Sequence, residues 1–128
     1  MAKEVATTKA PSAVGPYSQA VQAGNTLYCL GQIGLNPETG KFASANAVDQ
    51  ATQALHNLRE VVTAAGFDFG NVVKVIVFMA DVNDFGDINK VYDQFFGGAK
   101  VLPARSAVGV NGLPLGAKVE IEAIAVKD

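Results

Sequence analysis

The sequence predicts an α+β fold, a two-layer mixed β-sheet with two helices on one face. Three observations predict it: extended apolar segments lie toward both ends of the chain, two internal segments repeat apolar residues at helical spacing, and the two kinds of segment alternate. The 128 residues, of which 49% are hydrophobic, suit one domain spanning residues 1–128 with a single core.

A β-hairpin is predicted near the start of the chain. The extended segments 17–22 and 26–34 are separated by Gly24-Asn25, a pair that favours a tight turn. These two segments should therefore be neighbouring antiparallel strands.

A long helix should follow the turn at 36–40. Ser44 or Asn46 can cap it, because both side chains accept hydrogen bonds from the free N–H groups of a first helical turn. Gly66 marks its C-terminal end. Apolar residues at alternating steps of three and four predict its buried stripe, formed by Val48, Ala51, Leu55, Leu58, Val62 and Ala65.

A strand and a second helix come next. Segment 72–80 is rich in β-branched residues, which is typical of a strand. Asp84 can cap the helix after it, and Gly97-Gly98 should end that helix. Its buried stripe is expected to consist of Ile88, Val91, Tyr92 and Phe95.

The last two strands are expected at 104–110 and 118–126. Segments 72–80 and 118–126 are apolar on both faces, whereas two helices cover only one face of a sheet. The other face should therefore pack against another copy of the chain, with sites between subunits.

Composition excludes several classes of partner. The formal net charge is −2 and the lysines are scattered, so neither nucleic acid nor an anionic membrane is expected as a partner. No apolar run reaches the roughly 20 residues of a membrane-spanning helix, and residues 1–5 lack a signal-peptide core, so a cytoplasmic location is expected. Cys29 is the only cysteine; we expect it to pack in the core, with no disulfide and no metal site.

Arg105 is the residue most indicative of function. It is one of two arginines in the chain, and apolar strand-like residues flank it, so it needs an anionic partner. Glu120 and Glu122 lie in the last predicted strand, which we expect to neighbour the strand of Arg105. One interpretation is a buried ion pair; the other is that Arg105 binds a substrate carboxylate while Glu120 transfers protons in a partly dry cleft.

The two glutamates lie on one side of their strand, because side chains alternate with a period of two. Apolar surroundings would raise the pKa of Glu120 or Glu122, and a nearby Arg105 would lower it. Parity does not say which of the two matters, and both could also lie in solvent near a strand end.

Weaker candidates lie elsewhere in the chain. Tyr17 could supply a phenol or an aromatic wall, Asn89 could bond a ligand, and Gly31 could allow close approach of a ligand; packing, capping and a β-bulge are the respective alternatives. His56 is expected at the surface. Segment 112–118 lacks the spacing of a phosphate-binding loop and should only connect strands.

Five motifs occur along the chain in a fixed order. They are Gly15-Pro16-Tyr17-Ser18-Gln19-Ala20, Gly31-Gln32-Ile33-Gly34, Asn83-Asp84-Phe85, Pro103-Ala104-Arg105-Ser106 and Val119-Glu120-Ile121-Glu122. In these motifs and their order, the chain resembles the RidA (YjgF) family of reactive intermediate deaminases over nearly its whole length. That resemblance implies a chorismate-mutase-like α+β fold assembled as a homotrimer with sites between subunits.

The resemblance also implies a reaction: hydrolysis of 2-imino acids, such as 2-iminobutanoate and 2-iminopropanoate, to 2-oxo acids and ammonia, with no metal or organic cofactor. Arg105 and the backbone N–H of Ala107 would hold the substrate carboxylate, and Glu120 would position water and transfer protons, while Glu122 would be structural. The residues implied to line the pocket are Tyr17, Gly31 and Asn89.

Two positions depart from the family pattern. Ala107 stands where many members have cysteine, a mild change because the expected contact comes from the backbone. Leu30 stands where many have serine, and it cannot hydrogen-bond water or ammonia, so we expect an altered preference for substrate size or a reduced rate. A trimer that binds carboxylates or acts as a chaperone without turnover is the alternative function; ribonuclease activity is disfavoured by the negative charge and the lack of a histidine pair.

Overall fold

All six strands form one sheet. The computed structural model describes residues 1–128, and its strand order is β1-β2-β3-β6-β4-β5. β4 and β5 are parallel, and every other neighbouring pair is antiparallel. The strands are β1 (Ala2–Val5), β2 (Ala20–Ala23), β3 (Thr26–Ile33), β4 (Val72–Met79), β5 (Ala104–Gly109) and β6 (Val119–Val126); the helices are α1 (Ala47–Ala64) and α2 (Phe85–Phe96).

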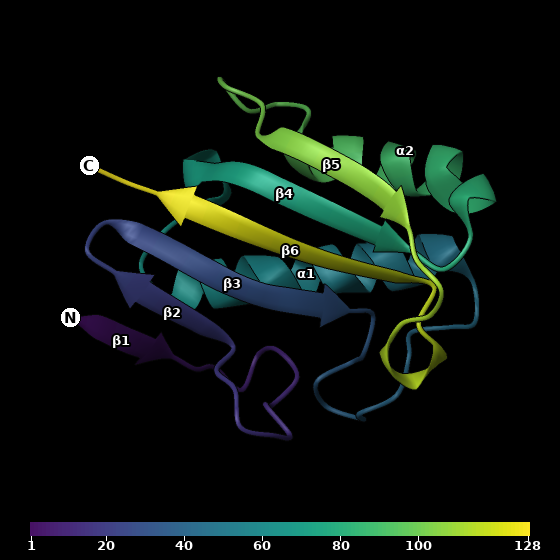
Figure 1. Ribbon diagram of the computed structural model, residues 1–128, viewed down its shortest axis with the longest axis horizontal. Coiled ribbons are helices and arrows are strands. Elements are labelled where there is room, and N and C mark those ends of the chain that lie inside the picture. Colours follow the sequence, from purple (N-terminus) through teal and green to yellow (C-terminus); the bar gives the residue numbers. More distant parts are fainter.

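Both helices lie on one face of the sheet, α1 across β3 and β6 and α2 beside α1 toward β5 (Figure 1). This confirms the predicted α+β, two-layer arrangement. The core lies between the layers, where apolar residues of the helices meet one face of the central strands. Neither helix combines the length and the apolarity that spanning a membrane requires.

The local signals of α1 are confirmed with one exception. Asn46 caps the helix, its Oδ1 accepting a hydrogen bond from the Asp49 N–H at 2.8 Å. Gly66 follows the helix with φ +82°, a conformation that favours glycine. Val48 is 41% exposed, so its predicted burial is wrong; the stripe begins at Ala47, which is one residue, or about 100°, away around the helix.

The second helix differs from its prediction in its N-terminal cap and in the buried residue of its last turn, whereas it ends at Gly97 as predicted. Asp84 precedes α2, but its side chain makes no capping hydrogen bond, because Asp84 already has helical backbone angles as the last residue of a 3₁₀ turn, Val82–Asp84. Ile88, Val91 and Tyr92 are buried as predicted. At the C-terminal end Phe96 is fully buried, whereas Phe95 is only partly buried.

The predicted hairpin is confirmed as β2 and β3, and two other features of the sheet were not predicted. β1 pairs antiparallel with β2 at the edge of the sheet, and its side chains at Lys3 and Glu4 are exposed, so no apolar pattern marked it as a strand. β5 and β6 are not neighbours, because β4 lies between them. The expectation that Arg105 and Glu120 lie on adjacent strands is therefore wrong.

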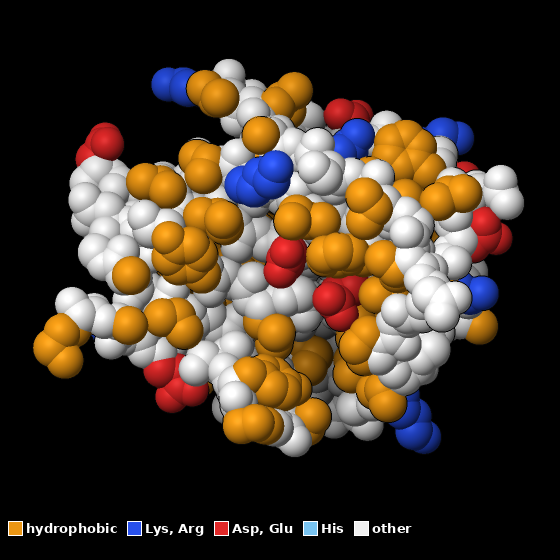
Figure 2. Space-filling view, viewed as in Figure 1, with side chains coloured by type: hydrophobic (Ala, Val, Ile, Leu, Met, Phe, Trp, Pro, Cys, Tyr) orange, Lys and Arg blue, Asp and Glu red, His pale blue; other side chains and the backbone are white.

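The face of the sheet opposite the helices is apolar and bare. Figure 2 shows hydrophobic side chains spread over this face with acidic groups among them. Tyr28, Val108 and Val126 are between 41% and 51% exposed there, and Ile76 and Ile124 are half-buried. The central strands thus carry apolar residues on both faces, as the sequence predicted.

Candidate active site

Glu120 lies on β6 and faces a cavity of about 720 Å³, which we call the Glu120 cavity. Glu120 pairs with Ile33 of β3 and with Phe78 of β4, and its side chain is half-buried. Three segments complete the wall: part of the loop 11–17, the end of β3 with the loop that follows, and the loop around Leu115. The cavity thus forms around one partly buried carboxylate.

Gly31 provides the space that this carboxylate occupies. A Cβ atom at Gly31 would lie 2.5 Å from Oε2 of Glu120, closer than real Cβ contacts come. The pairing of β3 with β6 is irregular between Cys29 and Gln32, so Gly31 also lies in a bulge. The sequence left open whether Gly31 serves a ligand or a bulge; the structure has the bulge, and the group that approaches Gly31 is the Glu120 side chain.

Burial raises the pKa of Glu120 above that of an ordinary glutamate, and the neighbouring negative charge of Glu122 raises it further. Arg105 is not among the causes of this pKa shift. A carboxylate with a raised pKa accepts protons more readily, which suits a general base working near neutral pH.

Tyr17 and Leu30 form part of the wall near Glu120. The Tyr17 hydroxyl oxygen accepts a hydrogen bond from the Val14 N–H at 3.1 Å, and this bond fixes the ring against the loop. Leu30 immediately precedes Gly31 and adds apolar surface to the cavity. The wall around Glu120 therefore combines one phenol and a few polar side chains with aliphatic groups, and Leu30 adds no hydrogen-bonding atom.

Arg105 lies on β5 and contacts α2. Its Nη1 donates a hydrogen bond to Oδ1 of Asn89 at 2.6 Å. The guanidinium carbon lies 4.6 Å from the centroid of the Tyr92 ring and 5.5 Å from that of Phe85, distances at which a cation and an aromatic face attract. Asn89 and the two rings hold the guanidinium in place while it stays at the surface.

Arg105 makes no ion pair, so the buried ion-pair interpretation is wrong. The one ion pair in the chain joins His56 to Glu60 at 4.0 Å, on the surface of α1. A guanidinium carries five N–H donors, and Asn89 accepts from one nitrogen only. Arg105 keeps donors free for an anion.

Asn89 and Ala107 lie near Arg105. The amide oxygen of Asn89 is occupied by the guanidinium, so the direct role of Asn89 is to orient Arg105. The Val110 N–H points toward β4, where it donates to the Met79 carbonyl at 2.8 Å. N–H groups alternate in direction along a strand, so the Ala107 N–H, three residues earlier, points to the free edge of β5.

Within one chain the two groups of candidate residues lie on opposite faces of the sheet. Arg105 is paired with Val75, whose side chain is buried on the helix side, whereas Glu120 is paired with Phe78, whose side chain points the other way. With strands ~4.8 Å apart and ~3.3 Å per residue, their Cα atoms are roughly 14 Å apart. The structure brings together Tyr17, Gly31 and Glu120, and separately Arg105, Asn89 and Ala107.

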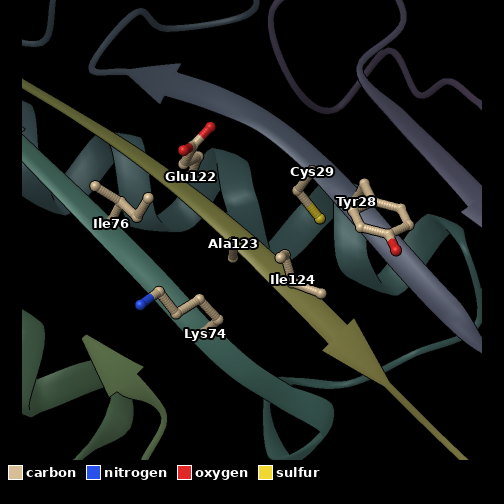
Figure 3. A pocket seen from close by; sticks show the side chains of 7 residues that line it. All are labelled: Tyr28, Cys29, Lys74, Ile76, Glu122, Ala123 and Ile124. Atoms are coloured by element: carbon tan, nitrogen blue, oxygen red, sulfur yellow. The ribbon is translucent and has the colours of Figure 1, made fainter. Parts of the chain in front are cut away.

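Glu122 lines a different, smaller cavity on the bare face. This cavity, of about 160 Å³, lies over β3, β6 and β4, and Figure 3 shows Glu122 and Lys74 around it together with Tyr28 and Cys29. Burial raises the pKa of Cys29 to about 12, so its thiol is protonated at neutral pH. Cys29 is buried as expected, and Glu122 does not line the Glu120 cavity.

Two expectations outside the site, on His56 and on segment 112–118, are confirmed. His56 is at the surface, with 55% of its side chain exposed. Segment 112–118 connects strands through a 3₁₀ turn, Pro114–Gly116. No group of three or more His, Cys, Asp or Glu side chains is arranged to hold a metal ion.

Two contributors to these sites were not predicted from the sequence. Tyr92 was expected only in the buried stripe of α2, yet its ring supports Arg105; its spacing of three residues from Asn89 was the available signal. Leu115 lies at the rim of the Glu120 cavity with φ +57° and is 73% exposed. Nothing in the local sequence beyond the adjacent glycine marks this strained conformation.

Comparison with known proteins places the chain in a family. Residues 7–127 match the family described as endoribonuclease L-PSP. A mouse protein named 2-iminobutanoate/2-iminopropanoate deaminase is 54% identical over 98% of this chain and 91% of its own length. The structure of E. coli TdcF with bound serine matches with a TM-score of 0.94 at 45% identity, covering 98% of this chain and 99% of that one.

A second E. coli structure, that of the yjgF gene product, matches with a TM-score of 0.93 at 46% identity, again over 98% of this chain and 99% of that one. The similarity to these relatives, in sequence and in fold, thus extends over nearly the whole length of the chain. The chain belongs to the RidA/YjgF family, the one described as endoribonuclease L-PSP.

Proposed function

We propose that this chain hydrolyses 2-imino acids, 2-iminobutanoate and 2-iminopropanoate among them, to 2-oxo acids and ammonia. The observation that carries the proposal is the Glu120 carboxylate, half-buried in a cavity and with a raised pKa. The chain that holds it is 54% identical to the mouse protein named 2-iminobutanoate/2-iminopropanoate deaminase. Arg105 adds a guanidinium with free donors for the carboxylate that every 2-imino acid carries.

The proposed reaction needs water and proton transfers but no covalent bond between enzyme and substrate. Glu120 accepts a proton from a water molecule as the water oxygen bonds to the carbon of the protonated imine, giving a tetrahedral intermediate with an amino and a hydroxyl group. The same carboxyl then returns the proton to the nitrogen. The C–N bond breaks, ammonia leaves, and the hydroxyl group passes its proton to Glu120 and becomes the carbonyl of the 2-oxo acid.

Arg105 and the Ala107 N–H are proposed to bind the substrate carboxylate. The Arg105 guanidinium has free donors beside α2, the Ala107 N–H faces the free edge of the same strand, and a carboxylate can accept from two donors at once. The E. coli relative TdcF was solved with bound serine, which also carries a carboxylate next to the carbon that bears nitrogen. Tyr17, Gly31 and Leu30 shape the space for the rest of the substrate.

A complete site is proposed to need two copies of the chain. Arg105 and Glu120 lie on opposite faces of one sheet, so one molecule of substrate reaches both only if Arg105 of one subunit approaches Glu120 of another. The bare apolar face supports such an assembly, since exposed patches of this kind mark interaction surfaces. We propose a homotrimer with a cleft at each of its interfaces.

Neither a metal nor an organic cofactor is part of the proposal, because the imine carbon is already electrophilic and Arg105 and Glu120 supply charge and proton transfer. A cytoplasmic location stays a prediction from the sequence. The preferred side chain of the imine should be apolar, because Leu30 and its neighbours line the cavity with aliphatic groups.

The test generates the two imines in place with an amino-acid oxidase and traps the free imine with semicarbazide. The intact chain should suppress trapping, and the Arg105→Ala variant should not. If the intact chain leaves trapping of both imines unchanged, the deaminase proposal is wrong, and carboxylate binding without turnover becomes the better account.

RNA cleavage is the alternative that the family description suggests. The single histidine lies on the surface of α1 beside Glu60, and the formal net charge is −2, so neither feature favours RNA. Degradation of RNA that co-purifies with the assembled protein and is lost in Glu120→Gln would favour this alternative instead.

A further inference from the structure

Three buried amide side chains bond the loops that form the wall of the Glu120 cavity. Gln19, Gln50 and Asn57 are each at most 4% exposed, and each bonds to backbone groups in or next to a wall segment. A buried amide without partners is unfavourable, so such side chains fix the backbone that they bond. These bonds have no part in the proposed chemical steps.

Gln19 holds the N-terminal loop. Its Oε1 accepts from the Thr7 N–H at 2.7 Å, and its Nε2 donates to the carbonyl oxygens of Thr7 at 3.1 Å and Pro11 at 2.7 Å, with the Ala10 carbonyl at 3.4 Å. Pro11 lines the cavity, and the loop continues from it to Tyr17. The Gln19 carbonyl also accepts from the Leu30 N–H at 2.9 Å, which ties the loop to β3 beside the carboxylate.

Asn57 holds the second wall segment from the side of α1. Its Nδ2 donates to the carbonyl oxygens of Ile33 at 3.2 Å and Leu35 at 2.8 Å, and both of these residues line the cavity. Its Oδ1 accepts from Nε2 of Gln53 at 2.8 Å, so the oxygen and both N–H donors of this amide are engaged.

Gln50 lies about two turns before Asn57 on α1 and bonds the segment that leads into Glu120. Its Oε1 accepts from the Lys118 N–H at 2.8 Å, and its Nε2 donates to the Ser44 carbonyl at 2.9 Å. Lys118 lies two residues before Glu120 and directly after the loop that carries Leu115. Gln50 therefore fixes where β6 begins relative to α1.

We propose that Gln19, Gln50 and Asn57 are positioning residues that hold the three wall segments in place around Glu120, so that the cavity keeps its shape before substrate binds. Each position could be filled by an apolar side chain of similar size, but the carbonyl groups of the wall would then lose their donors. A pre-formed wall reduces the ordering that substrate binding requires. The effect on catalysis rests on the proposed function; the effect on the loops does not.

Gln19→Met is the sharpest variant, because it keeps the length of the side chain and removes every one of its hydrogen bonds. Gln22→Met is the matched control: Gln22 lies on β2, which begins directly after Gln19, makes one hydrogen bond to the Gly24 carbonyl at 3.1 Å, and does not line the cavity. Both proteins are compared with the unaltered chain as assembled protein, at a temperature where circular dichroism shows each to be folded.

Two quantities are measured: backbone hydrogen exchange at Val14 and Tyr17, and kcat/KM for 2-iminobutanoate. In Gln19→Met we expect both exchange rates to rise and kcat/KM to fall, each by about tenfold or more, because small displacements of positioning groups lower rates strongly. Gln22→Met should leave both exchange rates and kcat/KM within about twofold of those of the unaltered chain. Unchanged exchange overturns the positioning role, and so does faster exchange with kcat/KM unaffected.

Gln50→Met provides a second test that does not depend on the folding of Gln19→Met. If Gln50 keeps the cavity closed around Glu120, its loss admits water and should move the acid limb of the pH profile of kcat/KM to lower pH. A lower rate with the acid limb in its original place would mean that Gln50 only stabilises the fold. Failure of the proposed function itself would be seen in the unaltered chain, which would then turn over neither imine.

Discussion

The surroundings of Glu120 and of Arg105 are built in different ways. Glu120 lies within the sheet, half-buried, in a space that only glycine at position 31 leaves open. Arg105 lies near the free edge of β5 and is exposed; it is held by one hydrogen bond that it donates to Asn89 and by the faces of aromatic rings. The proton-transferring group is thus fixed by the core, and the carboxylate-binding group by a surface contact with α2.

One fold can therefore carry two halves of a site, around Glu120 and around Arg105, that do not meet within a single chain. Burial raises the pKa of Glu120 without help from Arg105, so the first half is chemically prepared on its own. Arg105 has an orienting partner but no anion, so the second half is prepared to bind. Substitutions in the two halves should therefore affect catalysis in distinguishable ways.

Glu120→Gln should have the largest effect. The amide keeps the size of the side chain but cannot accept a proton, so kcat should fall by about 10³-fold, within the range typical of general acid–base catalysis, with little change in KM. Steady-state kinetics of imine hydrolysis measures it. Glu122→Gln is the control on the same strand face and should lower kcat by less than about threefold; equal losses in both variants would remove Glu120 from its role.

Arg105→Ala should come next, with about a 10²-fold loss in kcat/KM carried mainly by KM, because removal of a charge-assisted bidentate contact weakens binding of the carboxylate. Arg59, the only other arginine, also lies over aromatic rings, at 4.7 Å from the Phe95 centroid, and Arg59→Ala is the matched control. A loss in Arg59→Ala as large as that in Arg105→Ala would show that packing, and not carboxylate binding, explains the effect.

The pH dependence should separate the two halves further. Since the pKa of Glu120 is raised, kcat/KM should fall with decreasing pH already above the range of an ordinary glutamate, and Glu122→Gln should move this acid limb to lower pH by removing a negative neighbour. Arg105→Ala should move the limb the other way, to higher pH, because the proposed site brings Arg105 of one subunit close to Glu120 of another. A limb that moves to lower pH in Arg105→Ala would contradict this arrangement.

The same pKa shift predicts that Glu120, although it supports catalysis, lowers the stability of the fold at neutral pH. A carboxyl with a raised folded-state pKa binds more protons when folded, so stability falls as pH rises from the unfolded pKa to the folded pKa, and ionised Glu120 destabilises the fold at neutral pH. Glu120→Gln should therefore have a Tm at neutral pH at least equal to that of the unaltered chain, measured by thermal unfolding. A markedly lower Tm would indicate that Glu120 serves structure.

Leu30→Ser should have the smallest effect. It replaces apolar wall beside Gly31 with a hydroxyl, so the ratio of kcat/KM for a large apolar imine to that for 2-iminopropanoate should fall by up to about tenfold, the low end of the ~10–200-fold that one methylene in a hydrophobic pocket confers. Competition between the two imines measures the ratio directly. No kinetic change in this variant would show that Leu30 plays no part in substrate preference.

The elements of the fold could be predicted where local signals are strong. The Asn46 cap, the stripe of α1 and the turn between β2 and β3 all follow from short-range chemistry. β1 escaped prediction because its edge position leaves Lys3 and Glu4 in solvent, so burial imposed no alternation on it. Val48 was misplaced because a step of three back from Ala51 gives Val48 and a step of four gives Ala47, and both steps fit helical periodicity.

The candidate residues could be named from the sequence, but not their arrangement. The order of strands in the sheet places β4 between β5 and β6, and only this long-range pairing puts Arg105 and Glu120 on different faces. Whether Gly31 served a ligand or a bulge also depended on a contact across strands, with the Glu120 side chain. The partners of the buried amides were equally out of reach, because Gln50 and Lys118 are 68 residues apart in sequence.

Arg105 and Glu120 of different subunits are proposed to form one site, and mixing two impaired variants tests this arrangement. Arg105→Ala and Glu120→Gln chains are unfolded together in equal amounts and refolded. Imine hydrolysis is then assayed at substrate concentrations well below KM, where both single variants are strongly impaired, beside each variant refolded alone. Random assembly into a ring of head-to-tail contacts should restore about a quarter of the unaltered activity, since one interface in four would join an intact Arg105 to an intact Glu120. Activity no higher than that of the separate variants would contradict a site shared between subunits.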